Sequence, residues 1–253
     1  MPRANWPELS KVLFSLPPPA EQRTIADTLG AVDALLTGQR ALLAKKRDLK
    51  QATQQALLTR ARRLPGFAGE WEERTLGELA HIKTGKKNNE DKVEGGRYPF
   101  FVRSQTVERI NSYSYDGEAI LLPGEGNIGG IFHYINGKFD YHQRVYKVSG
   151  FANGVNGRFI FHYMTEFFGV HAAENSVKAA VDSLRLPTFK EFIVALPCAN
   201  EQKAIVEILS AMDAEIEGLT QQLAKTEALK QGLMQDLLTG TIRLSGVGHT
   251  PSA

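Results

Sequence analysis

The sequence predicts an α+β protein: a globular domain with a mixed or antiparallel sheet, flanked by two long helices that pair as an antiparallel coiled coil. Three observations support this fold. One 44-residue segment occurs twice, 180 positions apart; both copies have the periodicity of a long helix; and the residues between them contain short strand-like runs. Because a repeat at a fixed offset indicates a duplicated structural unit, it is interpreted first.

The two copies of the repeat, residues 16–59 and 196–239, align without a gap and are identical at 20 of 44 positions. Both begin with Leu-Pro, contain a Glu-Gln-basic triplet and end at Leu-Leu-Thr. The prolines prevent each helix from continuing upstream, and Glu21 and Glu201 suit the positive end of a helix dipole. Gly240 is a suitable stop for the second helix. At 1.5 Å per residue, each helix should be about 60 Å long.

Apolar residues recur at alternating steps of four and three in both copies, which is the pattern of a coiled-coil seam. The seam turns polar at the same place in both copies, at Lys46 and at Thr226, where a small phase shift can bring Leu49 and Leu229 into the contact. The alternative is two amphipathic helices packed on their own globular domain, although a seam two residues wide is narrow for that role. The predicted seam consists of Ile25, Leu29, Val32, Leu36, Leu43, Leu57, Ile205, Leu209, Met212, Ile216, Leu219, Leu223, Leu233 and Leu237.

Charge and composition favour pairing of the two helices and argue against disulfide-bonded, metal-binding and membrane-spanning proteins. The formal net charge of +2 is too small to indicate nucleic-acid binding, but residues 20–63 carry nine basic and four acidic side chains and residues 198–244 carry four and seven. Opposite charge favours pairing of the two helices with each other. The single cysteine, Cys198, excludes an internal disulfide, and no Cys/His spacing predicts a metal site. Apolar runs are too short to span a membrane, so we expect a soluble cytoplasmic protein.

The residues between the repeats predict the α+β domain. Gly- and Asn-rich turn signals separate the strand-like segments, and Ile135 to Phe139, with Asn136-Gly137 at its centre, is typical of a tight hairpin turn. The predicted strands are 78–83, 98–103, 118–122, 130–135, 144–148 and 192–196, and the predicted helices are 157–172 and 186–192.

A set of motifs occurs in a fixed order along the chain. They are Leu16-Pro17 and Glu21-Gln22-Arg23, the two Leu-Leu-Thr helix ends, Trp71, Leu76-Gly77-Glu78-Leu79, Lys83-Thr84-Gly85, Leu196-Pro197, and Glu201-Gln202-Lys203. In these motifs and their order, the chain resembles the specificity subunit of type I restriction-modification enzymes. In that family, two target-recognition domains alternate with two conserved helices, which form an antiparallel coiled coil. The resemblance implies a subunit that places a methyltransferase and a translocating nuclease on a bipartite DNA sequence.

The resemblance also implies a division of the chain into domains. Residues 20–63 and 198–240 correspond to the two conserved spacer helices, 64–197 to one target-recognition domain, and 241–253 to a flexible tail. Residues 1–19 resemble the end of a recognition domain, and we expect them to be the vestige of a missing one. The chain therefore resembles the C-terminal half of a specificity subunit, expected to work as a homodimer or with another half-subunit.

The predicted function is sequence-specific recognition of double-stranded DNA, reading one half-site and positioning the modification methyltransferase and the restriction/translocase subunits. No catalytic activity and no cofactor are expected for the chain itself. Because it contains no Asn-Pro-Pro-Tyr or Asp-Pro-Pro-Tyr motif of adenine methyltransferases, S-adenosylmethionine should bind the partner. The alternative is a non-catalytic coiled-coil adaptor or decoy that binds methyltransferase subunits.

Candidate DNA-binding residues follow from the chemistry of base edges, since Arg pairs with guanine, and Asn or Gln with adenine. Such residues concentrate in four loop segments, although each segment also suits an ordinary solvated loop. Gly85 is expected to permit close backbone approach to DNA. The candidates are Lys83, Thr84, Lys86, Lys87, Asn88, Asn89, Arg103, Ser104, Gln105, His142, Gln143, Arg144, Asn175, Ser176 and Lys178.

Enzymatic interpretations are weaker. His133 alternates with apolar residues in a strand and Glu125 lies in a glycine turn, so ordinary structural roles are favoured for the four groups of a possible acid-base set. Gly124-x-Gly126-x-x-Gly129 matches a dinucleotide fingerprint, but no helix is predicted after it, and the match is dismissed. The possible acid-base set is Glu125, Asp140, His133 and His142.

Overall fold

The computed structural model describes residues 7, 11, 16–175 and 183–244. They form two compact units, Met1–Leu49 with Met212–Ala253 and, separately, Lys50–Ala211. Helices α2 (Pro19–Leu58) and α6 (Ala199–Thr239) contribute to both units, and each unit is described by itself. Most of residues 1–19 and the end of the predicted tail lie outside the described residues.

The ends of the two long helices follow the sequence closely. α2 ends at Leu58 rather than at the predicted residue 63, and α6 ends at Thr239. Gly240 follows with a φ of 74°, a left-handed conformation that favours glycine and terminates the helix as expected.

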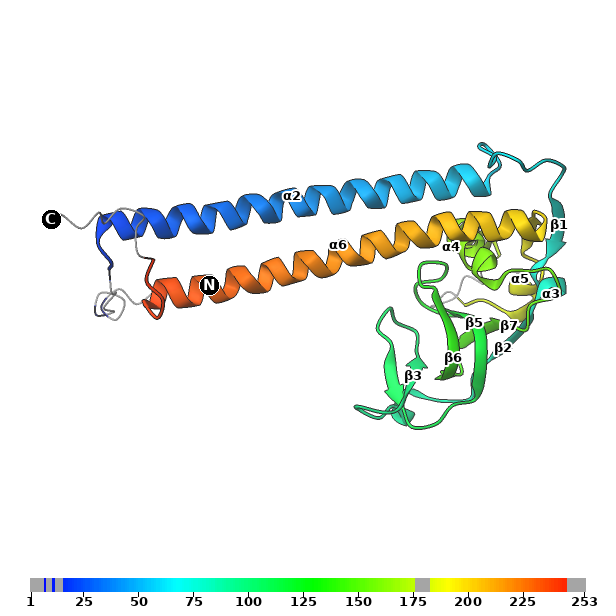
Figure 1. Ribbon diagram of the computed structural model, residues 1–253. Helices are drawn as coiled ribbons and strands as arrows, with labels where there is room; N and C mark the ends of the chain where they lie inside the picture. Colours follow the sequence, from blue (N-terminus) through cyan, green and yellow to red (C-terminus); the bar gives the residue numbers. More distant parts are fainter. Residues whose placement is uncertain (1–6, 8–10, 12–15, 176–182, 245–253) are drawn as a thin grey trace. The chain divides into compact units, whose positions relative to one another are not determined.

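In the first unit, α2 and α6 run side by side in opposite directions (Figure 1). Their ion pairs demonstrate the orientation, because residue numbers fall along α6 as they rise along α2. In each pair at least one partner is well exposed, so each contributes less than about 1 kcal/mol. The pairs are Asp33–Lys230 (2.6 Å), Arg40–Glu227 (2.7 Å), Lys46–Glu215 (2.6 Å) and Glu21–Arg243 (2.5 Å), the last reaching from α2 to a residue just beyond α6.

Apolar side chains of the predicted seam lie at the contact between these helices. Leu36 and Leu43 are 3% and 5% exposed, whereas the adjacent Leu35 and Leu42 are 52% and 42% exposed. The remaining seam positions of this unit, from Ile25 to Leu43 and from Met212 to Leu237, are buried or half-buried. The alternation is that of a two-residue stripe in contact with a partner helix.

The phase shift predicted at the polar part of the seam is wrong. Leu49 and Leu229 are 51% and 57% exposed, so neither enters the contact. Instead the seam continues through Thr226, which is buried, and through the half-buried Lys46 and Lys230. A lysine stem can cover apolar surface while its ammonium group reaches a carboxylate at the edge.

The second unit contains a six-stranded mixed sheet in the order β2-β7-β5-β6-β3-β4 (Figure 1). All its pairings are antiparallel except that of β3 with β6. This confirms the predicted fold class. The strands are β2 (His81–Thr84), β3 (Tyr98–Phe101), β4 (Glu108–Ile110), β5 (Tyr115–Pro123), β6 (His133–Tyr141) and β7 (Val145–Ser149).

Two further strands join the beginning and the end of this domain. β1 (Glu72–Thr75) pairs antiparallel with β8 (Ile193–Leu196). The short elements are α3 (Leu76–Leu79), η1 (Asn89–Asp91) and α5 (Leu186–Lys190).

Apolar side chains form a packed cluster on each face of the sheet. Because alternate residues of a strand face opposite sides, Ile120 and Leu122 of β5 pack in the core beneath α4 (Gly157–Glu174), whereas Ala119 and Leu121 pack in a second cluster with Phe139. All four β5 residues are fully buried. Both helices predicted in this domain are found, as α4 and α5.

The predicted hairpin turn at Asn136-Gly137 is wrong. Gly137 lies in the middle of β6, directly opposite Gly117 of β5, and the two strands stay paired from Tyr115 opposite Phe139 to Leu121 opposite His133. Gly117 and Gly137 have φ values of 142° and 147°, which side chains rarely permit. The glycine therefore permits, within a long strand pair, a backbone conformation that other residues rarely adopt, and the connection lies at residues 124–132.

An ion pair with a buried carboxylate holds the beginning of α6. Glu201 is 1% exposed, and its two carboxylate oxygens accept hydrogen bonds from Arg63 Nε (2.9 Å) and Nη2 (2.8 Å). Arg63 also donates to the carbonyl of Gly69. Glu201 thus lies in the first turn as expected, but its main partner is a guanidinium group rather than the helix dipole alone.

Gln202 ties the beginning of α6 to the beginning of α4. Its Nε2 donates to the carbonyls of Pro197 (2.8 Å) and Gly154 (3.1 Å), and its Oε1 accepts from the backbone N–H of Asn156 (2.8 Å). Asn156 in turn caps α4, accepting at Oδ1 from the N–H groups of Arg158 and Phe159. Since Gln202 is 1% exposed, water cannot replace these bonds.

Replacing Leu36 with Asp should destabilise the helix pair by several kcal/mol, because it places an uncompensated charge in the seam. Leu35→Asp is the matched control, since its side chain is exposed in the same turn of α2, and it should cost less than about 0.5 kcal/mol. Urea unfolding followed by circular dichroism measures both. Equal effects would contradict the assigned seam.

Gln202→Leu should cost about 2–4 kcal/mol, because it removes the hydrogen-bond partner of the Asn156 N–H and of the Pro197 and Gly154 carbonyls. Lys203→Leu changes the next residue, which is exposed and forms a long 3.9 Å pair with Glu207. It should be nearly neutral. If thermal or urea unfolding showed no difference between the two variants, Gln202 would not have the structural role described.

Candidate nucleic-acid interface

Three of the four predicted DNA-binding segments meet at one end of the sheet. Residues 83–89 leave β2, 103–105 follow β3, and 142–144 connect β6 to β7. The first and third are joined directly: the Gln143 N–H donates to the Lys87 carbonyl (2.8 Å), and Gln143 Nε2 donates to Asn88 Oδ1 (2.6 Å). The loops are therefore braced against one another.

Gly85 has a role within the fold itself. A Cβ atom there would lie 2.0 Å from the carbonyl oxygen of Tyr141 and 2.6 Å from that of His142. The glycine is required because the 83–89 segment crosses the end of β6 at close range.

A carboxylate that the sequence analysis set aside links the second and third segments. Glu125 Oε1 lies 2.7 Å from Arg144 Nη1, and its Oε2 lies 3.3 Å from Arg103 Nη1. The Glu125 side chain is 19% exposed, against 45% and 58% for Arg103 and Arg144. One half-buried acid thus pairs with two exposed arginines that arrive from different strands.

The backbone fixes Glu125 in place. The Gly124 N–H donates to the Arg144 carbonyl (2.9 Å), and the Leu184 N–H donates to the Gly124 carbonyl (2.8 Å). Glu125 itself forms an isolated antiparallel bridge with Ser183. Its sequence context, between glycines, indicated only a turn, and no local pattern identifies two partners that lie 22 and 19 residues away.

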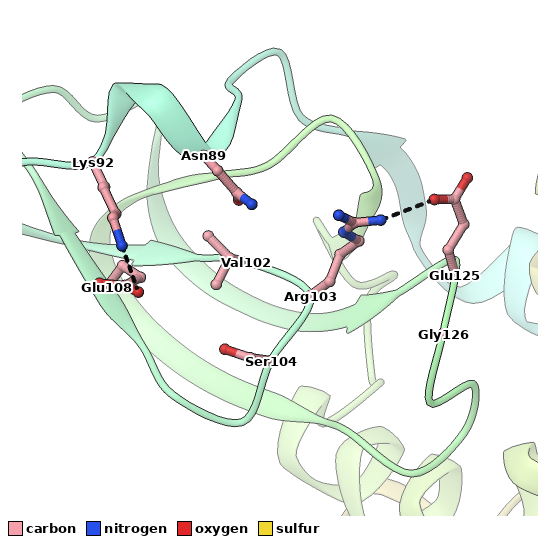
Figure 2. A pocket seen from close by; sticks show the side chains of 8 residues that line it. All are labelled: Asn89, Lys92, Val102, Arg103, Ser104, Glu108, Glu125 and Gly126. Carbon is pink, nitrogen blue, oxygen red and sulfur yellow. Dashed lines mark hydrogen bonds and ion pairs between the residues drawn. The ribbon is translucent and has the colours of Figure 1, made fainter.

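Beside this ion pair lies a cavity of about 440 Å³. Figure 2 shows Arg103 and Glu125 at one end of it and a second ion pair, Lys92 with Glu108 (3.3 Å), at the other. The lining is mainly polar and charged, which suits base edges and phosphates more than an apolar ligand. It consists of Asn89, Lys92, Val102, Arg103, Ser104, Glu108, Glu125 and Gly126.

His142 is a hydrogen-bonding group of the same cluster. Its backbone N–H donates to the Phe101 carbonyl (2.9 Å), and its Nδ1 accepts from the Arg144 N–H (2.9 Å). Burial lowers the pKa of His142, and the guanidinium groups of Arg103 and Arg144 lower it further. The ring is therefore neutral at neutral pH, with its proton on Nε2.

The other predicted residues of these loops are exposed or paired locally. Lys87 lies 3.6 Å from Asp91, whose carboxylate also accepts from the Asn88 N–H, and this hydrogen bond lowers the pKa of Asp91. Ser104 donates to the carbonyl of Thr106. The exposed candidates are Lys83, Thr84, Lys86, Asn88, Asn89, Arg103, Ser104, Gln105, Gln143 and Arg144.

The fourth predicted segment is described only in part. Asn175 is exposed and follows the last residue of α4, whereas Ser176 and Lys178 lie outside the described residues. The chain is described again from Ser183, which pairs with Glu125.

The remaining two members of the possible acid-base set, Asp140 and His133, have structural partners of their own. Asp140 is 2% exposed and accepts from the hydroxyls of Ser112 (2.9 Å) and Ser114 (2.7 Å). His133 Nε2 lies 3.1 Å from the Ser104 carbonyl, and burial lowers the pKa of this ring. Within the described residues, no group of three or more His, Cys, Asp or Glu side chains is placed to hold a metal ion.

Lys147 is a basic residue of the sheet that the sequence analysis did not single out. It is 8% exposed, and its Nζ lies 3.3 Å from the centre of the Tyr115 ring. Burial, assisted by the neighbouring charge of Lys83, lowers the pKa of Lys147 to about 8. A lysine in a strand is normally assigned to solvent, so only the fold reveals this one.

Comparison with known proteins identifies the family. A family model for the type I restriction modification DNA specificity domain matches residues 68–228. The chain belongs to this family. The resemblance inferred from the motifs is therefore confirmed, and the matched region includes the whole sheet and the beginning of α6. Over the described residues, no helix is long and apolar enough to cross a membrane.

Two curated specificity subunits are similar to the chain. The type I restriction enzyme EcoDI specificity subunit of Escherichia coli is 29% identical over 170 residues, covering 67% of this chain. The MjaVIII specificity subunit of Methanocaldococcus jannaschii is 25% identical over 279 residues, covering 95% of this chain. The chain spans 37% and 66% of these relatives' own lengths.

Solved structures share the fold. The S subunit of a type I restriction-modification system from M. genitalium matches 87% of this chain and 61% of its own, with a TM-score of 0.69 at 18% identity. The HsdS subunit from Thermoanaerobacter tengcongensis matches 90% of this chain and 60% of its own, with a TM-score of 0.52 at 19% identity. Both are specificity subunits, so the fold and the family agree.

Proposed function

We propose that the chain recognises a specific DNA sequence as one half of a type I specificity subunit and performs no chemistry itself. The observation that carries this proposal is that three loops rich in amide and basic side chains converge at one end of the sheet. Exposed Arg103, Gln143 and Arg144 offer the donors that read guanine and adenine edges, and Lys83 and Lys86 offer charge for phosphates.

The proposed partners follow from family membership. A modification methyltransferase would bind S-adenosylmethionine and methylate the target, and a restriction/translocase subunit would complete the enzyme. The chain would only determine where on double-stranded DNA these subunits act. The alternative of an adaptor or decoy differs in one measurable respect, because it requires no preference for any DNA sequence.

Gln143→Ala should weaken binding to the preferred duplex by about 1–3 kcal/mol and relax discrimination at one base pair. Lys86→Ala should instead weaken binding to all duplexes and reduce the slope of log affinity against log salt by about 1. The affinity of each variant is measured by fluorescence anisotropy, with one duplex selected from a randomised pool and one unrelated duplex. Failure of the unmodified chain to enrich any sequence would favour the adaptor. Identical behaviour of the two variants would contradict the division into base and phosphate contacts.

The repeat supports a second proposal, about the partner of the helix pair. Residues 180 positions apart have equivalent local contacts: Gln22 donates to the Pro17 carbonyl as Gln202 does to that of Pro197, both at 2.8 Å. Glu21 pairs with Arg243 as Glu201 pairs with Arg63. The beginning of α2 therefore repeats two of the polar contacts that hold the beginning of α6.

The apolar surroundings of the two equivalent regions differ. Leu58 is 2% exposed in the core of the recognition domain, together with Ile205 and Trp71, whereas the equivalent Leu238 is 61% exposed. Leu238 lines an apolar cavity of about 640 Å³ in the first unit. The cavity is lined by Leu16, Pro17, Gln22, Ile25, Ala26, Leu29, Leu237 and Leu238.

We infer that this cavity receives a second recognition domain, in the way that the equivalent residues pack against the first. The observation behind it is that each lining residue is the counterpart of one buried or half-buried in the second unit: Leu196, Pro197, Gln202, Ile205, Val206, Leu209, Leu57 and Leu58. A second copy of the chain or a different half-subunit could provide it. Two identical copies would give a palindromic target, and a different half-subunit an asymmetric one.

Methylation mapping in cells that express the chain with its methyltransferase should give a motif of two parts separated by a fixed gap. Leu238→Asp should abolish this methylation without lowering the melting temperature, since the residue is exposed in the chain alone. Leu35→Asp, also exposed on the helix pair but outside the cavity, should leave methylation intact. A single short, uninterrupted motif would contradict a second recognition domain.

A further inference from the structure

The Arg103–Glu125–Arg144 cluster holds a carboxylate in the middle of a surface proposed to bind a polyanion. We propose that Glu125 is a specificity-determining positioning residue that holds Arg103 and Arg144 for guanine in the DNA target. This inference rests on the proposed function and goes further, because it names the base that is read and a residue that determines the choice.

The contacts of Glu125 leave one edge of each guanidinium group available. Both arginines reach it through Nη1, Arg144 at 2.7 Å and Arg103 at 3.3 Å. No hydrogen bond to a described residue engages Nε or Nη2 of either arginine. These two nitrogens lie on the same edge of the guanidinium plane and form the pair of parallel donors that matches O6 and N7 of guanine.

The Glu125 carboxylate is more buried than the two arginine side chains, as a residue that holds them in position should be. The Glu125 side chain is 19% exposed, and its backbone is fixed by the pairing with Ser183, whereas Arg103 and Arg144 remain 45% and 58% exposed. A free arginine loses much rotamer freedom when it binds a base. An arginine already held by a fixed carboxylate loses less, so the cluster is ordered before DNA arrives.

Charge gives a second argument. With two arginines and one carboxylate, the cluster carries a net charge of +1 rather than +2. A surface selected only for phosphate attraction would gain from losing the acid, because each additional positive charge strengthens binding to any sequence. The carboxylate therefore lowers general affinity for DNA while it orients two donors. Specificity and general affinity should respond in opposite directions when it is neutralised.

The experiment compares the full chain with Glu125→Gln and with Glu90→Gln. Each variant removes one negative charge from the recognition domain, but Glu90 is exposed on η1 and contacts neither arginine. The preferred duplex is selected from a randomised pool with the unmodified chain. Fluorescence anisotropy then gives affinities for this duplex, for versions with each G·C pair changed to A·T, and for an unrelated duplex.

The unmodified chain should discriminate against at least one G·C to A·T change by roughly 5- to 150-fold, the range expected for a bidentate pair. Glu125→Gln should lose most of this factor while binding the unrelated duplex at least as tightly as the unmodified chain. Glu90→Gln should keep the discrimination. Arg144→Lys retains the charge but not the planar pair of donors, and it should lose discrimination too, which provides a test should Glu125→Gln fail to fold.

Two results would overturn the inference while leaving the proposed function intact. One is a selected target without guanine, and the other is full discrimination in Glu125→Gln and Arg144→Lys. Failure of the unmodified chain to enrich any sequence is distinguishable from both, because it would reject the proposed function itself, and the role of Glu125 with it.

Discussion

The recognition domain depends on the buried polar contacts at the beginning of α6. Glu201 and Gln202 are each 1% exposed, and between them they engage Arg63, the carbonyls of Pro197 and Gly154, and the N–H of Asn156, the residue that caps α4. Buried polar groups of this kind are costly unless every partner is present, so they admit one arrangement of the two helix starts. Because α4 covers one face of the sheet, the same contacts fix the sheet on which the candidate interface is built.

Strands and loops contribute differently to the candidate interface. The strands bring segments distant in the sequence to one end of the sheet, and short polar bonds then brace the loops: Gln143 with Asn88, and Glu125 with Arg103 and Arg144. Exposed ion pairs add little to stability, so their value lies in the orientation of the side chains. A reader of DNA benefits from such ordering, because base edges are distinguished by donors in fixed geometry.

Features that depend on repeats and on helix or strand periodicity could be predicted from the sequence, and contacts between residues distant in the sequence could not. The repeat, the helix ends, the seam stripe and a sheet that is mixed or antiparallel follow from periodicity and from residues with strong local preferences, such as Gly240. Asn136-Gly137 was misassigned because the same pair of residues occurs both in turns and within strands, and only the pairing of Gly137 with Gly117 decides between them. The role of Glu125 could not be foreseen, since its partners are far away in sequence. The predicted phase shift was wrong because the aliphatic stems of lysine residues can fill seam positions that are polar by residue type.

The most direct test of the account is hydrogen–deuterium exchange of the full chain with and without a saturating duplex that carries its selected sequence. If the braced loops form the DNA interface, amide exchange should slow in segments 83–89, 102–105, 124–126 and 142–144, while an unrelated duplex at the same concentration should protect them less. Slower exchange confined to α2 and α6, with these four segments unchanged, would contradict the central claim that this end of the sheet reads DNA.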